Sequence, residues 1–214
     1  MTTYYDTKKT ADHSPYVVHF VKERKFTTAH LITTSDPLFP YLESTALEKL
    51  MNILRSKTIY PSPMPYLPNN PKAVCFTECI WDALIELADR YSPYGIVFSK
   101  RTIFEKGGGP TLYVRGDNLK SMGNEIPECI EALIAPFDPE AVLMPGNILD
   151  WCHEREWRLP HELEFQHSDI EYLIVHSIAD ANEIVETFGT EVIPRNKILV
   201  MEVYRTIRSA WGKS

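Results

Sequence analysis

The sequence predicts an α+β domain in which a mixed β-sheet is flanked by helices. About seven segments rich in β-branched and aromatic residues alternate, in irregular order, with roughly four or five helical segments, a pattern typical of this fold class. Of the 214 residues, 44% are hydrophobic and 24% are charged, which is sufficient for one packed core. Because no internal repeat, linker or low-complexity segment divides the chain, we expect one domain, residues 16–214, behind a flexible N-terminal arm, residues 1–15.

The first half of the chain places three predicted strands and two predicted helices around a proline-rich loop. The strands are runs of β-branched and aromatic residues, and one of them carries His19 at its centre. The loop at residues 56–71 can hold neither a helix nor a central strand, because proline lacks the backbone donor that both require. The first helix is indicated by apolar residues at the spacing of one helical face, namely Leu47, Leu50, Met51 and Leu54. The predicted strands are 16–21, 73–77 and 94–99, and the predicted helices are 42–55 and 80–90.

The second half begins with a glycine-rich turn. The sequence G-G-G-P at residues 107–110 lacks the Lys-Ser/Thr pair and the following helix of a phosphate-binding loop, so we interpret it as a turn. The last predicted helix begins at a cap, either Ser177 or Asp180, and ends before Gly189. The predicted strands are 111–114, 148–159, 172–175 and 198–203, and the predicted helices are 126–135 and 180–188.

The composition argues against several classes of protein. A net charge of −7 lowers the expectation of a nucleic-acid partner, although a local basic groove can exist on an acidic protein. No apolar run approaches the roughly 20 residues of a membrane helix, and the N-terminal residues lack the apolar core of a signal peptide. We therefore expect a cytoplasmic protein with no membrane partner and no metal site. Its cysteines lack zinc-binding spacing and are expected to be reduced; they are Cys75, Cys79, Cys129 and Cys152.

The most informative segment is D-W-C-H-E-R-E-W-R-L-P, residues 150–160. If this segment is a strand, its side chains alternate between two faces. The two faces then consist of Glu154, Glu156 and Arg158, and of Arg155, Trp157 and Leu159. Charges on one side and large apolar groups on the other are typical of a strand that lines a polar cleft and has its back in a core.

The pair Glu154 and Glu156 on one strand face is the first candidate for function. Two carboxylates so placed repel each other unless a cation, a proton or a hydroxyl-bearing ligand lies between them. An exposed edge strand with ion pairs along it is the alternative, but Trp157 favours a strand that is anchored in a core. His153 could join these carboxylates in a metal site, but alternation places it on the opposite face, which counts against a metal.

Several segments together resemble the ADP-ribosyltransferase fold. The opening strand of that family carries a His or Arg, matched here by V-H-F at residues 18–20. The helix and extended step that follow resemble residues 47–59. The next two strands resemble V-C-F-T-E at residues 74–78 and G-I-V-F at residues 95–98. This resemblance implies a mixed split sheet with flanking helices.

A narrower resemblance rests on four motifs within residues 16–160. The combination of C-F-T-E, Y-G-I-V-F-S-K, G-G-x-P-x-x-Y-V and E-x-E-W-R is similar to uncharacterised bacterial abortive-infection proteins of the AbiGi type. This resemblance implies a role in phage defence or in a toxin–antitoxin system.

The broader resemblance also implies a chemistry, the transfer of ADP-ribose from NAD, which breaks a glycosidic bond through a cation-like sugar. The catalytic glutamate of the family would be Glu156 or Glu154. Glu156 suits binding of the ribose 2′-hydroxyl and stabilisation of the developing positive charge, and Glu154 could reach the acceptor, a nucleic acid or a protein. His19 would donate a hydrogen bond to the other ribose or to the pyrophosphate; a core histidine bonded to a carbonyl is an equal alternative. Thr77 and Ser99 are further candidates for binding NAD, although strand hydroxyls usually satisfy the backbone.

One departure from the family concerns the nicotinamide ring. The polymerases stack it on a tyrosine in the helix after the second strand, and the predicted helix at residues 80–90 has none, so Trp81 or Tyr91 would have to replace it. Two functions therefore stay open. The first is an NAD-dependent ADP-ribosyltransferase whose cleft is faced by both His19 and Glu156. The second is a non-enzymatic, partner-binding or antitoxin-like protein that binds a cognate toxin or antitoxin.

Overall fold

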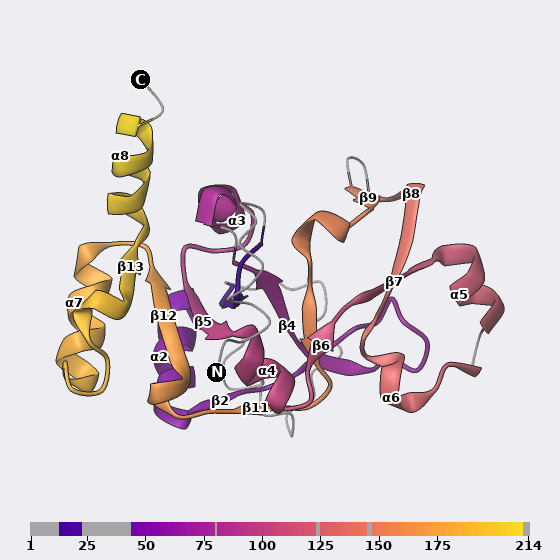
Figure 1. The fold of residues 1–214 in the computed structure, drawn as a ribbon, viewed down its shortest axis with the longest axis horizontal. Coiled ribbons are helices and arrows are strands. Elements are labelled where there is room, and N and C mark those ends of the chain that lie inside the picture. Colours follow the sequence, from indigo (N-terminus) through magenta and orange to yellow (C-terminus); the bar gives the residue numbers. More distant parts are fainter. Residues whose placement is uncertain (1–12, 23–43, 80, 123–124, 145–146, 212–214) are drawn as a thin grey trace. The chain divides into compact units, whose positions relative to one another are not determined.

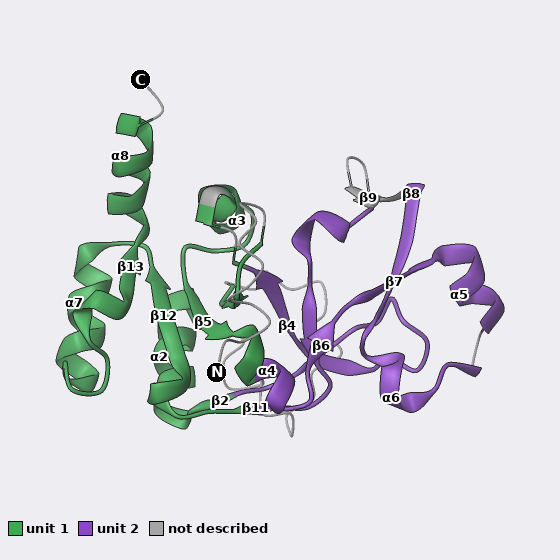
Figure 2. Ribbon diagram, viewed as in Figure 1, with its two compact units in different colours: residues 1–58, 79–102, 164–214 green, residues 59–78, 103–163 purple. Residues whose placement is uncertain are grey.

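The structure, a computed structural model, describes residues 13–22, 44–79, 81–122, 125–144 and 147–211 (Figure 1). Most of the predicted N-terminal arm lies outside these residues. The described part combines α-helices with mixed sheets, which confirms the predicted α+β class. The chain divides into two compact units (Figure 2), residues 1–58, 79–102 and 164–214, and residues 59–78 and 103–163. Whether residues 16–214 behave as one domain stays a prediction.

The first unit contains a sheet with both parallel and antiparallel neighbours. β1 and β5 are antiparallel, with Val18 opposite Val97, and β5 and β12 are also antiparallel, whereas β12 and β13 are parallel. This arrangement confirms three predicted strands, those at the start of the chain, in its middle and after residue 170. In sheet order, the strands are β13 (Ile198–Val200), β12 (Ile170–Val175), β5 (Gly95–Ser99) and β1 (Tyr16–Phe20).

Helix α2 (Ala46–Ser56) belongs to the first unit and begins at a capping box. The Thr45 side chain accepts a hydrogen bond from the N–H of Glu48, and the Glu48 carboxylate accepts one from the N–H of Thr45. Two otherwise unpaired donors are thereby satisfied at the helix start. The helix buries three of the apolar residues predicted for its inner face, namely Leu50, Met51 and Leu54.

Helix α7 (Ile178–Phe188) begins in the same way. Of the two predicted caps the structure uses Ser177, whose side chain accepts from the N–H of Asp180 while the Asp180 carboxylate accepts from the N–H of Ser177. Gly189 ends the helix as predicted, with a φ of 84° that favours glycine.

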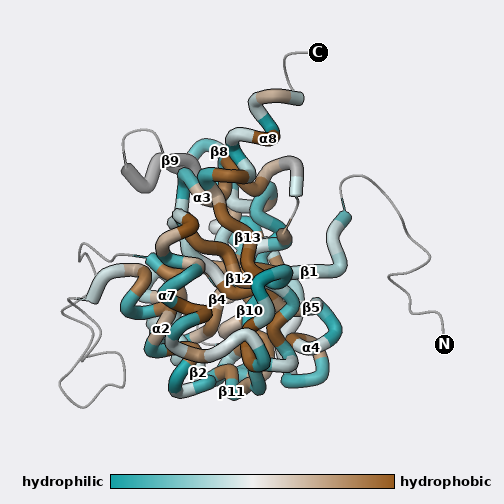
Figure 3. The backbone as a smooth tube through the Cα atoms, turned by 90° about the vertical axis from the view of Figure 1, so that its left-hand side faces the viewer, coloured by the Kyte–Doolittle hydropathy of each residue, from teal (hydrophilic) through white to brown (hydrophobic). Residues whose placement is uncertain are grey.

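The core of the first unit joins the sheet to the 3-10 turn η3 (Trp81–Ala83), to α3 (Leu84–Arg90) and to the first residue of α8 (Met201–Trp211). Hydrophobic residues dominate this region, as the brown tube around β12 shows (Figure 3). The buried members of this cluster are Val18, Cys79, Leu84, Ala88, Val97, Ile174 and Met201.

The second unit contains two small sheets. In one, β10 (Trp157–Leu159) lies between β4 (Lys72–Glu78) and β6 (Gly109–Pro110) and is antiparallel to both, while β3 (Ser62–Pro63) also pairs with β4. In the other, β8 (Ile134–Met144) is parallel to β7 (Leu112–Arg115) and antiparallel to β9 (Asn147–Leu149). Further elements of the described residues are α4 (Lys100–Glu105), α5 (Gly116–Met122), α6 (Glu128–Glu131), β2 (Thr58–Ile59), β11 (Leu163–Glu164), η6 (His167–Asp169) and η7 (Arg195–Lys197).

The predicted continuous strand at residues 148–159 is wrong. β9 ends at Leu149, the 3-10 turn η5 (Cys152–Glu154) follows, and β10 begins only at Trp157. Arg155 follows η5 with a φ of 45°, in the left-handed region, so the chain turns here instead of staying extended. Side chains therefore alternate between the two sheet faces from Glu156 through β10, but this alternation does not extend back to Glu154.

Two other predicted elements are partly wrong. The predicted helix at residues 126–135 shrinks to α6, because the chain from Ile134 onward pairs with β7 as strand β8. The predicted strand at residues 198–203 ends at Val200 and continues as α8. Helices α4 and α5 were not predicted, since helices of six and seven residues give little periodic signal.

Trp157 provides a test of the packing of the second unit. Its side chain is 8% exposed and lies opposite Phe76 on β4, so Trp157→Ala removes a large buried group. We expect the free energy of unfolding, measured by chemical denaturation, to fall by about 3–5 kcal/mol. Trp211→Ala is the matched control: Trp211 is 72% exposed, and its loss should change stability by less than about 0.5 kcal/mol. Equal stability of the two variants would show that Trp157 does not anchor the strand.

Candidate functional site

The polar face of β10 carries a densely hydrogen-bonded cluster in the second unit. The β10–β4 register sets Arg158 opposite Cys75. Continued from Arg158 by two residues toward the N-terminus, the same register sets Glu156 opposite Thr77. The β10–β6 register sets Arg158 opposite Gly109, and the Thr111 N–H donates to the Glu156 carbonyl over 2.8 Å. Residues directly opposite each other in an antiparallel pair share a face. Glu156 is therefore flanked on its own face by two threonines, one from each side.

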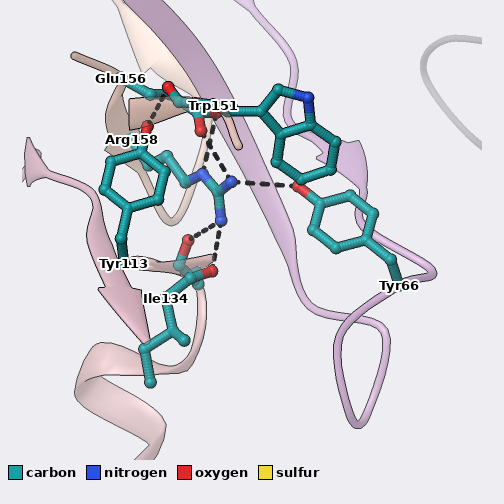
Figure 4. Close-up of polar contacts among 7 residues, drawn as sticks. Tyr66, Tyr113, Ile134, Trp151, Glu156 and Arg158 are labelled. Atoms are coloured by element: carbon teal, nitrogen blue, oxygen red, sulfur yellow. Dashed lines mark hydrogen bonds and ion pairs between the residues drawn. The ribbon is translucent and has the colours of Figure 1, made fainter. Parts of the chain in front are cut away.

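Arg158 and Glu156 form a bidentate ion pair inside the protein (Figure 4). Arg158 Nε donates to Glu156 Oε1 over 3.0 Å, and Arg158 Nη2 donates to Glu156 Oε2 over 2.8 Å. The Arg158 side chain is 1% exposed and that of Glu156 is 12% exposed. Residues 156 and 158 do share a face, as alternation predicted, but they form a closed pair instead of lining an open cleft with free charges.

The other donors of Arg158 are also satisfied. Nη1 donates to the carbonyl of Ile134 over 2.6 Å and to that of Ala132 over 3.4 Å, and Nη2 donates to the Tyr66 hydroxyl over 3.0 Å (Figure 4). With the two bonds to Glu156, these contacts use the full set of guanidinium donors. Burial alone would lower the pKa of Arg158, but the hydrogen bonds and negative charge of Glu156 outweigh it and raise that pKa above its usual value. Arg158 therefore stays charged and fixed.

Three aromatic side chains lie around this ion pair. Tyr66 and Trp151 pack with ring centroids 5.8 Å apart, and the Tyr113 hydroxyl donates to the Trp151 carbonyl over 2.8 Å. The Tyr66 residue is 42% exposed, although its hydroxyl reaches inward to Arg158. Burial raises the pKa of both the Tyr66 and the Tyr113 hydroxyls. Both tyrosines therefore stay protonated near neutral pH.

The threonines beside Glu156 are buried. Thr77 is 7% exposed and Thr111 is 8% exposed. Thr111 Oγ1 is a buried oxygen that has no hydrogen-bond partner within the described part of the chain. An unpaired buried hydroxyl costs stability, and such groups are uncommon in folded proteins. Thr111 therefore places a buried hydroxyl without a hydrogen-bond partner in the described residues next to Glu156.

The glycine run at residues 107–109 allows the chain to approach β10 closely. A Cβ added to Gly108 would lie 2.6 Å from Ile103 Cγ2 and 3.0 Å from the carbonyl oxygen of Arg158. Gly107 has a φ of 90°, which suits glycine, and Gly109 pairs with Arg158 as part of β6. The run thus forms a turn and a close backbone contact, in agreement with the interpretation from sequence.

A second ion pair involves the residue just before Glu156. Arg155 Nη1 lies 3.9 Å from Glu78 Oε2. The Glu78 side chain is 4% exposed and that of Arg155 is 39% exposed, so C-F-T-E and E-R-E-W-R, two of the motifs behind the resemblance, meet here in one partly buried contact.

The structure separates the remaining predicted site residues. Glu154 lies in η5 and not on the strand face of Glu156, so the prediction of a carboxylate pair on one face is wrong. Thr77 and Glu156 belong to the second unit, whereas His19, Trp81 and Ser99 belong to the first. The prediction that His19 and Glu156 face one cleft, and the roles assigned to these residues with NAD, stay predictions.

Within the first unit, the Ser99 side chain already has local contacts. It accepts from the N–H of Thr102 over 3.0 Å at the start of α4 and lies 2.8 Å from the Thr102 hydroxyl. His19 lies opposite Ile96, and alternation along β1 places it on the face away from Val18 and the cluster around it.

Both candidates for stacking on nicotinamide pack against other aromatic rings. Trp81 makes edge contacts with Tyr16 and Tyr172, with ring centroids 6.5 Å and 5.5 Å apart. Tyr91 stacks on Phe20 with centroids 5.5 Å apart, and Lys22 Nζ lies 3.9 Å from the Tyr91 ring centre. Both rings therefore have aromatic contacts within the first unit, and their roles with nicotinamide stay predictions.

Several residues of the cluster were not predicted. Tyr66 comes from the proline-rich loop, and Thr111 and Tyr113 come from the segment after the glycine run. A usable signal existed for Glu78, because it ends the C-F-T-E motif, but its partner depends on strand register. The carbonyls of residues 132 and 134 carry no signal in the sequence, since every residue has one.

Comparison of the chain with protein-family models, with curated proteins and with solved structures found no match. Among the described helices, none has the length and apolar character needed to cross a membrane. Within the same residues, no group of three or more histidine, cysteine, aspartate or glutamate side chains is arranged to hold a metal ion.

The ion pair predicts a specific pattern of stability. Glu156→Gln leaves a buried, uncompensated guanidinium, and Arg158→Met leaves a mostly buried carboxylate, so each should cost about 3–5 kcal/mol of unfolding free energy. The double variant removes both charges and should lose less than the sum, with a coupling energy on the order of 1–3 kcal/mol. Urea denaturation of the four proteins measures this cycle. Additive losses would mean that the two side chains do not depend on each other.

Proposed function

We propose that this chain is a non-enzymatic, partner-binding protein of the antitoxin-like kind, acting with a cognate toxin in a bacterial defence system. The observation that carries the proposal is the outer face of α8. Val203, Ile207 and Trp211 recur every four residues and are 41%, 44% and 72% exposed. A contiguous apolar stripe of this kind is typical of a protein–protein contact, and tryptophan is enriched among residues that dominate binding energy.

The hydrogen bonds of Glu156 support the same proposal because they argue against an enzyme that uses NAD. A carboxylate that stabilises a ribosyl cation must direct its charge at the sugar, but both oxygens of Glu156 are bonded to a buried guanidinium. Neither stacking candidate is readily available for nicotinamide, as the contacts of Trp81 and Tyr91 indicate. NAD therefore fits these residues poorly.

One observation favours the second candidate function, an NAD-dependent ADP-ribosyltransferase. Glu156 retains 12% exposure and lies on one sheet face with Thr77 and with the unpaired hydroxyl of Thr111. A ligand with hydroxyl groups would satisfy Thr111 and a remaining lone pair of Glu156 if the aromatic residues moved aside. Consumption of NAD by the purified protein would support this function if one threonine variant abolishes it and the other does not. The activity would be lost in Thr111→Val and kept in Thr77→Val, or lost in Thr77→Val and kept in Thr111→Val.

The two functions predict opposite results in one assay of phage protection or toxin neutralisation. For a binding protein, Ile207→Glu should abolish the effect while the melting temperature stays unchanged, because Ile207 is exposed. The Glu156→Gln/Arg158→Met double variant, compared under conditions in which it remains folded, should keep the effect. If the double variant is inactive and Ile207→Glu behaves as the wild type, the proposal is wrong and the transferase is favoured.

A further inference from the structure

We infer that three aromatic side chains of the first unit form a binding site for a methylated ammonium group. Tyr16 lies on β1, Trp81 in η3 and Tyr172 on β12, and we call these three rings, together with the Glu171 carboxylate, the aromatic corner. The inference goes beyond the proposed function, which concerns a protein contact on α8. Three observations support it: the angles between the rings, a β-bulge that places two of the groups, and the negative charge beside them.

The three rings stand nearly perpendicular to one another. The interplanar angle is 70° between Tyr16 and Trp81, and it is 89° between Tyr172 and each of the other two rings. The ring centroids are 5.5 to 6.5 Å apart. Perpendicular walls with these spacings bound a corner whose centre is about 4–5 Å from each ring centre, within the roughly 6 Å reach of a cation–π contact. Three negative ring faces therefore act together on one cation.

The aromatic corner lies at the margin of the core. Tyr16, Trp81 and Tyr172 are only partly buried, and all three pack against the buried cluster of the first unit. The backbone of Trp81 is fixed, because the Tyr204 hydroxyl donates to its carbonyl over 2.6 Å. The rings are therefore held by the core on one side and keep contact with solvent on the other. Such preorganisation lowers the entropic cost of binding a ligand.

A β-bulge in β12 places Tyr172 and Glu171. Ile170 and Tyr172 lie opposite successive residues of β5, 98 and 97, so Glu171 is an extra residue between them. Successive strand residues point to opposite faces, so the bulge puts Ile170 and Tyr172 on different faces although they are two residues apart. Tyr172 thereby shares a face with Tyr16, as the registers of both strands with β5 show. Bulges often occur beside functional sites, where they redirect a side chain.

The charge beside the rings is negative. Burial raises the pKa of the Tyr16 hydroxyl, and the negative charge of Glu171 raises that pKa further, which shows that this carboxylate acts on the ring. The net charge of the protein, −7, also attracts cations. A cation is therefore favoured over an anionic or neutral ligand of the same size.

A methylated ammonium group suits the aromatic corner better than a primary ammonium or NAD. A primary ammonium is strongly hydrated, and one carboxylate does not replace the water that it would lose. Methyl groups give the cation an apolar surface that ring faces accept. Nicotinamide is a flat ring that needs an open ring face, whereas the neighbours of Trp81 meet it at 70° and 89°. The same trimethylammonium group occurs in choline and in a trimethylated lysine side chain.

The test compares choline with its neutral isostere, in which a carbon atom replaces the nitrogen. Both are titrated into the full chain, and the indole N–H signal of Trp81 is followed by nitrogen-15 NMR, with the assignment made by its loss in Trp81→Leu. Choline should bind at least about fivefold more tightly than the isostere, because cation–π contacts require the charge. A short peptide with one trimethyllysine then identifies the source of the group, since the tighter of choline and peptide indicates a small molecule or a protein side chain.

Two variants and one matched control locate the site. Tyr172→Leu keeps an apolar side chain but removes one wall, and it should abolish detectable choline binding. Glu171→Gln keeps the shape of a partly exposed side chain and should weaken binding about two- to fivefold with an unchanged melting temperature. The control is Phe20→Leu, because Phe20 packs on the same core cluster but stacks on Tyr91, outside the aromatic corner. Its affinity for choline should equal that of the wild type.

Equal affinity for choline and the isostere, or no binding of choline at millimolar concentration, would overturn the inference and show that the rings serve packing alone. Displacement of choline by NAD at equal concentration would assign the site to nicotinamide and would also overturn it. So would equal loss of binding in Phe20→Leu and Tyr172→Leu. If Tyr172→Leu does not fold, the two ligands and Glu171→Gln still decide the question.

Discussion

The buried ion pair between Arg158 and Glu156 is the constraint on which the second unit depends. A guanidinium that is 1% exposed is tolerated only if its charge is balanced and its donors are bonded, because burying an unpaired charge is very costly. Those bonds join β10 to the carbonyls of residues 132 and 134 and to the Tyr66 hydroxyl in the proline-rich loop. Three segments far apart in sequence are therefore held at one point, and the choice of residues at 156 and 158 is explained without reference to catalysis.

The buried ion pair indicates a structural role for the E-R-E-W-R motif. Each of its charged residues near β10 has a structural contact: Arg158 with Glu156, and Arg155 with Glu78. Trp157, between them, packs opposite Phe76. A motif of this kind can mark a shared fold as well as a shared activity. Three exposed apolar side chains, Val203, Ile207 and Trp211, recur along α8, outside the motifs, which is why the proposed function follows that helix.

Local patterns in the sequence predicted the elements that local forces determine. The glycine turn at residues 107–109 and the strand around Val18 were identified, and the cap of α7 was narrowed to Ser177 or Asp180, because each depends on neighbouring residues. The predictions failed where distant contacts decide the structure. Ile134 lies in a strand because β7 is available to pair with it, and α8 begins at Met201 because that side chain enters the core. In the site, alternation identified the shared face of Glu156 and Arg158, but the turn at Arg155 removed Glu154 from it.

The central claim is that Glu156 is committed to Arg158 and does not act on NAD. The most direct measurement is the Arg158 Nε–H resonance in nitrogen-15 NMR spectra, recorded with and without NAD. A buried, bidentate pair should give a resolved Nε–H signal that exchanges slowly with solvent and does not move when NAD is added. A signal that exchanges rapidly, or that shifts with NAD in the wild type but not in Thr111→Val, would contradict the claim and return Glu156 to the chemistry of a transferase.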